Sequence, residues 1–183
     1  MVICSPRHRH PLRVFALCLV FLLAAQQRTL SQDTPKILPV TEINRILTDP
    51  SRTTPETVRF SGTVVFVSRV GDLNIQDGAA GIFVEPPADH PAARPGDRVE
   101  VTTSVAYQTA DLLSPSFFLK AAGLRILGPG ELPRAEQVPL ASALQGAAAG
   151  RRVQVEGVVM QATVENGVVM LHLTDQSGWA VVN

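Results

Sequence analysis

Two aspartates with similar surroundings, far apart in the chain, are the first candidates for chemistry. Asp77 lies in "LNIQDGAAGIFV" and Asp175 lies in "LHLTDQSGWAVV". An Asp-Gly pair followed by small residues is compatible with a phosphate-binding loop, a calcium-binding turn or the corner between two strands. A pair of carboxylates is also the usual equipment for general acid and base catalysis. Which of these four roles the aspartates have depends on the secondary-structure elements that position them.

An internal repeat favours the corner. "VRFSGTVV" (58–65) matches "VQVEGVVM" (153–160), which aligns Gly62 with Gly157, and the two segments quoted above align Asp77 with Asp175. The segments before them, "PVTEINRIL" and "PLASALQGA", also correspond. Gln176 replaces the glycine after the first aspartate, whereas a phosphate cradle depends on its glycines and on a following helix. We therefore expect both aspartates in strand-to-strand turns, accepting hydrogen bonds from the backbone amides of their own corner.

No other combination of residues predicts catalysis or a metal site. In "GDLNIQDG" the glycine falls at the wrong position for a calcium loop, and no Gly-x-Ser-x-Gly sequence marks a nucleophile. His90 and His172 belong to different repeat units, and Cys4 and Cys18 both lie near the N-terminus. We expect no catalytic residues, no metal, no cofactor and no enzymatic activity in this segment.

The N-terminus has the three parts of an export signal. Arg7, Arg9 and Arg13 precede an apolar run from Val14 to Ala25, which is shorter than the roughly twenty residues needed to span a bilayer. We predict a signal peptide over residues 1–31, cleaved after Ala25 or after Ser31, and export to the periplasm or to the outer face of the inner membrane. Residues 1–31 hold four of the sixteen basic residues and no acidic one, so residues 32–183 carry a net charge of −4.

The rest of the chain predicts an all-β protein with short helices. We expect a spacer and a helix in 32–57, with helical apolar spacing over 39–49, and a first barrel in 58–128. A linker and a second short helix follow in 129–152, and a second unit occupies 153–183. Strands of the first barrel are expected at 58–70, 73–76, 81–85, 98–107 and 117–128, the first of them bent at its interior glycine.

Five strands with a long bent first member predict a small closed barrel of the oligonucleotide/oligosaccharide-binding (OB) type. The second unit has only its first three strands, which leaves an open sheet edge and an uncovered apolar face. This pattern predicts that the sequence is the front of a longer protein.

The ligand surface of an OB barrel is formed by its second and third strands and by the loops that join strands one to two and four to five. The candidate ligand-binding residues on that surface are Arg69, Asn74, Gln76, Phe83, Glu85, Tyr107, Gln108 and Asp111. Because the exported part is acidic and aromatic residues are few, this reading disfavours nucleic acid as a partner. At most one of Phe117 and Phe118 can point inward if both lie in a strand. The other either caps the barrel end, which we favour, or is a contact for a neighbour.

The order of "RFSGTVVFV", "LNIQDGAAGIFVEPP", "RPGDRVEV", "LRILGPGELP" and "RRVQVEGVV" resembles the tandem OB-like extracytoplasmic region of bacterial membrane sensor proteins. The match covers roughly residues 39–183. In that family, a membrane helix and a histidine kinase or diguanylate cyclase domain follow. The resemblance implies a sensing module of a signal-transduction receptor, such as a two-component system. Its partner would be an unknown small ligand or protein, and its only membrane contact would be a segment missing from this chain. The alternative is an exported OB module that binds single-stranded nucleic acid or polysaccharide for an attached hydrolase.

Overall fold

The computed structural model describes residues 34–109, 118–145, 148–165 and 167–182. The expected signal peptide, Phe117 and Asp111 lie outside these ranges. The described residues after Thr34 belong to one compact unit, Pro35–Asn183. Its first half contains β1 (Lys36–Ile37), α2 (Val40–Thr48), β2 (Glu56–Val67), β3 (Leu73–Asp77), β4 (Ala80–Glu85), β5 (Asp97–Val105) and β6 (Phe118–Pro129). Its second half contains β7 (Glu136–Gln137), α3 (Leu140–Leu144), β8 (Val153–Gln154), β9 (Val158–Glu165), β10 (Val168–Asp175) and β11 (Gly178–Val182).

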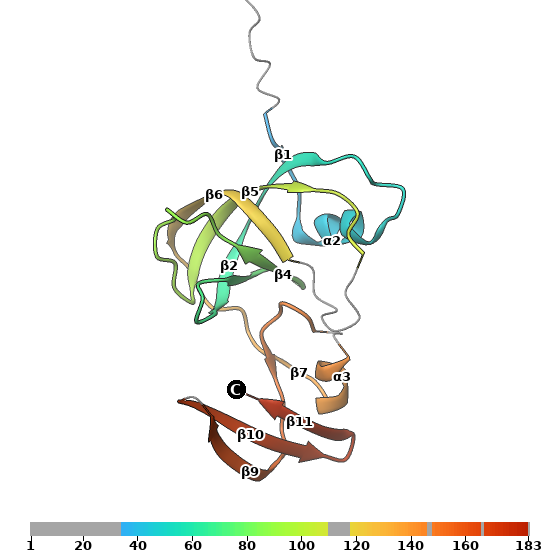
Figure 1. The fold of residues 1–183 in the computed structure, drawn as a ribbon, viewed down its shortest axis with the longest axis vertical. Coiled ribbons are helices and arrows are strands. Elements are labelled where there is room, and N and C mark those ends of the chain that lie inside the picture. The colour runs from blue at the N-terminus through green and yellow to red at the C-terminus, as the bar shows by residue number, and fades with distance from the viewer. Residues whose placement is uncertain (1–33, 110–117, 146–147, 166, 183) are drawn as a thin grey trace, which may run out of the picture. The chain divides into compact units, whose positions relative to one another are not determined.

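Five strands of the first half close into a barrel (Figure 1). The sheet order is β1-β2-β3-β4-β6-β5, and β2 also pairs with β5, so that β2 to β6 form a complete ring. All ring pairings are antiparallel except β4 with β6, which is parallel. This confirms the all-β, OB-like fold expected from the sequence.

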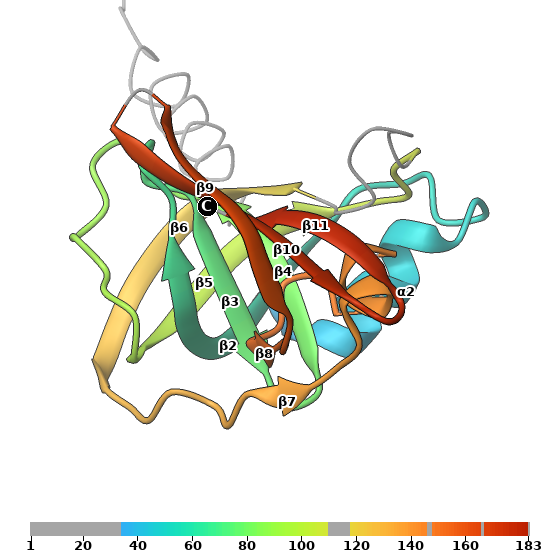
Figure 2. The same cartoon turned by 90° about the horizontal axis from the view of Figure 1, so that it is seen from below.

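Strand β2 closes the ring by serving two neighbours in turn. Its first part, from Glu56 to Thr63, pairs with β5, and its last part, from Thr63 to Val67, pairs with β3. Gly62 lies where the strand changes partner. A side chain there would meet the Cγ2 atom of Ile75 at 2.6 Å and the carbonyl oxygen of Gln76 at 2.8 Å. Only glycine permits this approach between the strands, and β2 curves strongly through the barrel wall (Figure 2).

The barrel core follows from strand alternation. Inward-facing residues of β2, β3, β4 and β5 are fully or almost fully buried, and Phe60 is the largest of them. Helix α2 adds its apolar face, because Val40, Ile43, Ile46 and Leu47 recur at helical spacing and are all buried.

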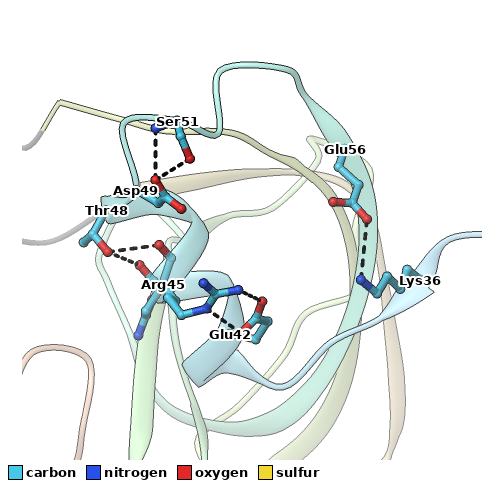
Figure 3. Close-up of polar contacts among 8 residues, drawn as sticks. Lys36, Glu42, Arg45, Thr48, Asp49, Ser51 and Glu56 are labelled. Atoms are coloured by element: carbon cyan, nitrogen blue, oxygen red, sulfur yellow. Dashed lines mark hydrogen bonds and ion pairs between the residues drawn. The ribbon is translucent and has the colours of Figure 1, made fainter.

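The polar side of α2 faces solvent (Figure 3). Arg45 forms an ion pair with Glu42, and the Oδ1 atom of Asp49 accepts hydrogen bonds from the backbone amide and the hydroxyl of Ser51. Lys36 on β1 lies 4.0 Å from Glu56 on β2. These exposed contacts contribute little to stability, since solvent screens them. Among the described residues, no helix is long and apolar enough to span a bilayer.

The second half repeats the first three barrel strands in identical register. In the first copy, Val64, Ile75 and Ile82 form one cross-strand row, and Val67, Leu73 and Val84 form the next. In the second copy, Val159, Leu173 and Ala180 form the first of these rows. Ala162, Leu171 and Val182 form the second. Even the bulge recurs, because the register shifts between Val64 and Phe66 in one copy and at His172 and Leu173 in the other. The domain boundaries given above stay a prediction.

Candidate binding face

The two aspartates hold helices in place. The Oδ2 atom of Asp77 accepts a hydrogen bond from the backbone amide of Val40, the first residue of α2, at 3.3 Å. Asp175 does the same for Leu140, the first residue of α3, at 3.1 Å. Neither helix has a side-chain cap of its own, since a proline precedes each. Each turn carboxylate therefore stabilises the start of a helix that is remote in sequence.

Asp175 also binds its own corner, as the sequence predicts. Its Oδ1 atom accepts hydrogen bonds from the Ser177 hydroxyl and from the amides of Ser177 and Gly178. The Ser177 hydroxyl, followed by the Leu140 amide, holds the pKa of this carboxyl below its usual range. The hydrogen bond that Asp77 accepts comes from the backbone amide of Val40 in the helix and not from its own corner. Both carboxylates thus have structural roles.

The outer face of the barrel carries a row of three phenylalanines and one asparagine, which we call the aromatic row: Phe66, Asn74, Phe83 and Phe118. Phe66 pairs with Asn74 across β2 and β3, Asn74 pairs with Phe83 across β3 and β4, and Phe83 pairs with Phe118 across β4 and β6. The row therefore crosses four neighbouring strands. Its members point outward, because the residues beside them, such as Leu73, Val84 and Leu119, are buried.

The aromatic row offers open ring surface. The rings of Phe83 and Phe118 lie 5.2 Å apart between centroids and are inclined at 31°. Phe66 is 55% exposed and Phe118 is 49% exposed. Large apolar side chains exposed at neighbouring positions of a sheet are a common mark of a binding surface.

Charges beside the row are few and largely balanced. Glu85 and Lys120 are the next outward pair along β4 and β6, and their charged groups lie 3.2 Å apart. Arg69 is exposed in the turn between β2 and β3. A ligand on this face would meet flat apolar rings, one amide side chain and a small number of cations.

The predicted ligand-binding residues divide into two groups. Asn74 and Phe83 lie in the aromatic row, Glu85 lies beside it, and Arg69 lies in the adjoining turn. Gln76 lies on the outer side of β3, but it is only 8% exposed. Its amide donates to the carbonyl oxygen of Gly78, and its Oε1 atom accepts from the backbone amide of Arg152. Gln76 therefore stabilises structure, although its role in binding stays untested.

Tyr107 and Gln108 follow β5 near the end of α2. Their backbone amides donate to the carbonyl oxygens of Arg52 and Leu47. Neither residue takes part in the strand pairing that builds the aromatic row. Asp111 lies outside the described residues.

Sequence reasoning missed two members of the row. The sequence places Phe66 in a long strand but does not show to which side of the strand its ring points. The bulge after Val64 changes the side to which later residues point. For Phe118 the sequence leaves open an inward position, a cap on the barrel end or a contact for a neighbour, with the cap favoured over the contact. Instead, Leu119 takes the inward position and Phe118 packs against Phe83. The parallel pairing of β4 with β6 brings these two rings together, and local sequence carries no sign of that pairing.

Two other places offer little chemistry. A hollow of about 360 Å³ in the second half is lined by Gln137, Val138, Pro139, Glu156, Asp175 and Gln176. The carboxylate of Asp175 in this lining already accepts hydrogen bonds from backbone amides and from the Ser177 hydroxyl. Within the described ranges, no three potential metal-ligating side chains gather at one point.

Comparison with known proteins yields structural neighbours only. No family model matches the chain, and no curated protein matches it. The telomere capping protein Ten1 from S. pombe is 13% identical with a TM-score of 0.37, covering 51% of this chain and 81% of its own. U. maydis replication protein A bound to ssDNA is 19% identical with a TM-score of 0.34, covering 51% of this chain and 72% of its own. An OBody bound to hen egg-white lysozyme is 17% identical with a TM-score of 0.39, covering 52% and 97%.

These neighbours correct one expectation. The acidic net charge was taken to disfavour nucleic acid as a partner, yet a structure similar to this chain is bound to ssDNA. That expectation is wrong, because net charge describes the whole chain and not one face of the barrel. At these identities and scores, the likeness transfers no residue roles. The chain is an OB-like barrel followed by a second, three-stranded copy of its first three strands.

Proposed function

We propose that this chain is a non-enzymatic OB-fold binding module that holds single-stranded nucleic acid against the aromatic row. The observation that carries the proposal is the row of Phe66, Asn74, Phe83 and Phe118 across β2, β3, β4 and β6. The Phe66 and Phe118 rings are exposed and the Phe83 ring is half-buried. Unstacked bases are flat on both sides and pack well on such rings whatever their sequence.

The row also predicts how the ligand is held. Stacking on an aromatic side chain contributes about 1–3 kcal/mol per base. Backbone contacts should be few, since Lys120 is paired with Glu85 and Arg69 is the exposed cation of the adjoining turn. Because each phosphate contact to a single strand steepens the salt dependence by about 0.7 in log–log slope, we expect a shallow slope of about −0.7 to −1.4. Stacking, with hydrogen bonds from Asn74, would then supply affinity more than charge does.

The test is a titration of the chain with a fluorescently labelled oligothymidylate at low and high salt. We expect Phe83→Ala and Phe118→Ala each to weaken binding by about five-fold to a hundred-fold, which is the equivalent of one lost stacking contact. Leu127→Ala is the matched control, because Leu127 is a comparably exposed apolar residue of β6 outside the row. Its affinity should equal that of the unchanged chain.

Three outcomes would contradict the proposal. One is an absence of binding at low salt, and another is binding that both phenylalanine variants retain in full. If an oligosaccharide displaces the labelled oligonucleotide and binds more tightly in the same titration, the ring surface serves sugars, and the nucleic-acid assignment is wrong.

We keep an exported sensing module as the second candidate function. The export-signal pattern of residues 1–31 and the tandem repeat support it, since both recur in the sensor family that the sequence resembles. In this reading, a ligand on the aromatic row changes the output of a membrane receptor. Removing residues 58–128 from the parent receptor should alter its output, and an unchanged output under all conditions would exclude this candidate.

A further inference from the structure

A carboxylate and an ammonium group lie next to the two packed rings of the aromatic row. The parallel pairing of β4 with β6 places Phe83 opposite Phe118 and Glu85 opposite Lys120. Side chains two residues apart on a strand point to the same side, so the charged pair follows the rings on the outer face, about 6.5 Å further along the strands. The Oε1 atom of Glu85 lies 3.2 Å from the Nζ atom of Lys120.

Both groups are fixed at the backbone and open to solvent at the side chain. Glu85 precedes Pro86. A residue before proline is restricted to an extended backbone, which keeps Glu85 in line with β4. The side chains of Lys120 and Glu85 are 80% and 53% exposed. Because an exposed ion pair contributes little to stability, these two groups can form hydrogen bonds to a ligand with little effect on the fold.

The two groups differ in the hydrogen bonds that they can form with the edge of a base. A carboxylate only accepts hydrogen bonds and an ammonium group only donates them. The Watson–Crick edge of guanine presents an acceptor, O6, followed by two adjacent donors, the N1 and N2 groups. The same edges of adenine, cytosine and thymine each present one donor flanked by acceptors, and a carboxylate repels those acceptors. Guanine is therefore the base whose edge complements a carboxylate beside an ammonium group.

We propose that Glu85 and Lys120 select guanine among the bases of a bound single strand, an inference that rests on the proposed function of the aromatic row. The guanine ring stacks on Phe83 and Phe118. Its N1 and N2 groups donate to the two carboxylate oxygens of Glu85, and its O6 atom accepts from the ammonium group of Lys120. The order along the edge fits, because Oε1 is the oxygen of Glu85 that lies next to Nζ of Lys120.

The probes are thymidylate oligomers with guanine, hypoxanthine or thymine at the central position. Hypoxanthine keeps the O6 and N1 groups of guanine and lacks the N2 amino group. We expect the guanine oligomer to bind about five-fold to a hundred-fold more tightly than the all-thymine oligomer, which is the usual discrimination by a bidentate contact. The hypoxanthine oligomer should lie between them. Equal binding of all three would overturn the selection and leave the proposed function intact, whereas no binding of any would overturn both.

Two exposed Glu–Lys pairs of the barrel provide matched variants. In Glu85→Gln, the amide pairs equally well with O6 and N1 of guanine and with O4 and N3 of thymine, so the ratio of the two affinities should fall to about one. Glu56→Gln is the control, because Glu56 pairs with Lys36 at 4.0 Å and begins β2, at the opposite end of that strand from Phe66. Its ratio should equal that of the unchanged chain. Equal ratios in the two variants would overturn the proposal.

Guanosine monophosphate distinguishes a strand from a free nucleotide as the source of the base. It presents the same edge but brings no second base to Phe66. We therefore expect it to compete at least about five-fold more weakly than the guanine oligomer, as for one lost stacking contact. Equal affinity would show that the pair serves a free nucleotide and would overturn the assignment to a strand.

Discussion

The two copies share a backbone plan and differ in what lies on it. Strand register, the bulge, the glycine at the crossing and the turn aspartate that starts a helix all recur, at Gly62 and Asp77 in one copy and at Gly157 and Asp175 in the other. The aromatic row does not recur. At the positions of Phe66, Asn74 and Phe83, the second copy has Gln161, His172 and Val181.

This contrast separates architecture from function. A residue present in both copies is explained by the fold they share, which is why the aspartates need no catalytic role. A row present in one copy alone has no such explanation, and we infer that its purpose is binding. The following predictions test each side of this comparison.

The largest expected effect is on the closed core. Phe60→Ala should lower the free energy of unfolding of the barrel by about 3–5 kcal/mol, because Phe60 is fully buried and its loss leaves a cavity. Val155, its counterpart, is half-buried. Val155→Ala should cost less than about 1 kcal/mol, as for a small change at a partly exposed site. Chemical denaturation monitored by circular dichroism measures both, and equal losses would contradict the difference in closure.

The glycine at the strand crossing should have the next largest effect. Gly62→Ala forces a side chain to within 2.8 Å of the Gln76 carbonyl oxygen, and Gly157→Ala does the same at the carbonyl oxygen of Thr174. Overpacking of this kind costs about 1–3 kcal/mol in a closed core. We expect that cost for Gly62→Ala in the unfolding of the barrel. For Gly157→Ala we expect faster hydrogen exchange confined to β9 and β10.

A smaller, local effect should follow the pH. The pKa of Asp175 is lowered in the folded chain, chiefly by the Ser177 hydroxyl, so the carboxylate stabilises the second copy above its unfolded pKa of about 3.9. This contribution is lost as the pH falls from there through the lower, folded pKa. Amide signals of Leu140 and Ser177 should shift in that acid range. In Asp175→Asn the same signals should not shift in that acid range, because the amide does not titrate.

The smallest effect is expected at the surface of α2. Glu42 forms an exposed ion pair with Arg45, whose guanidinium lowers the pKa of Glu42 through a side-chain hydrogen bond (Figure 3). Glu42→Gln should leave the thermal midpoint of the barrel unchanged within error, because solvent screens the pair. A clear fall in the midpoint would show that α2 depends on this contact more than on its buried apolar face.

The sequence predicted the barrel well because its signals are local. Alternation in β3 and β4, the interior glycine of β2 and the repeat itself are visible in neighbouring residues, and the strands lie close to where they were expected. The candidate binding face was predicted only in part. Asn74 and Phe83 follow from alternation, but Phe66 follows a bulge and Phe118 arrives through a parallel pairing with a distant strand. Strand alternation places Gln76 on the outer face, yet its side chain accepts a hydrogen bond from the backbone amide of Arg152 in the linker.

The most direct test of the binding face is a titration of the ¹⁵N-labelled chain with oligothymidylate at low salt, followed by backbone amide shifts. The account predicts saturable shifts at Phe66, Asn74, Phe83 and Phe118, and none at the counterparts Gln161, His172 and Val181. Shifts confined to the second copy, or no shifts at any oligonucleotide concentration, would contradict it.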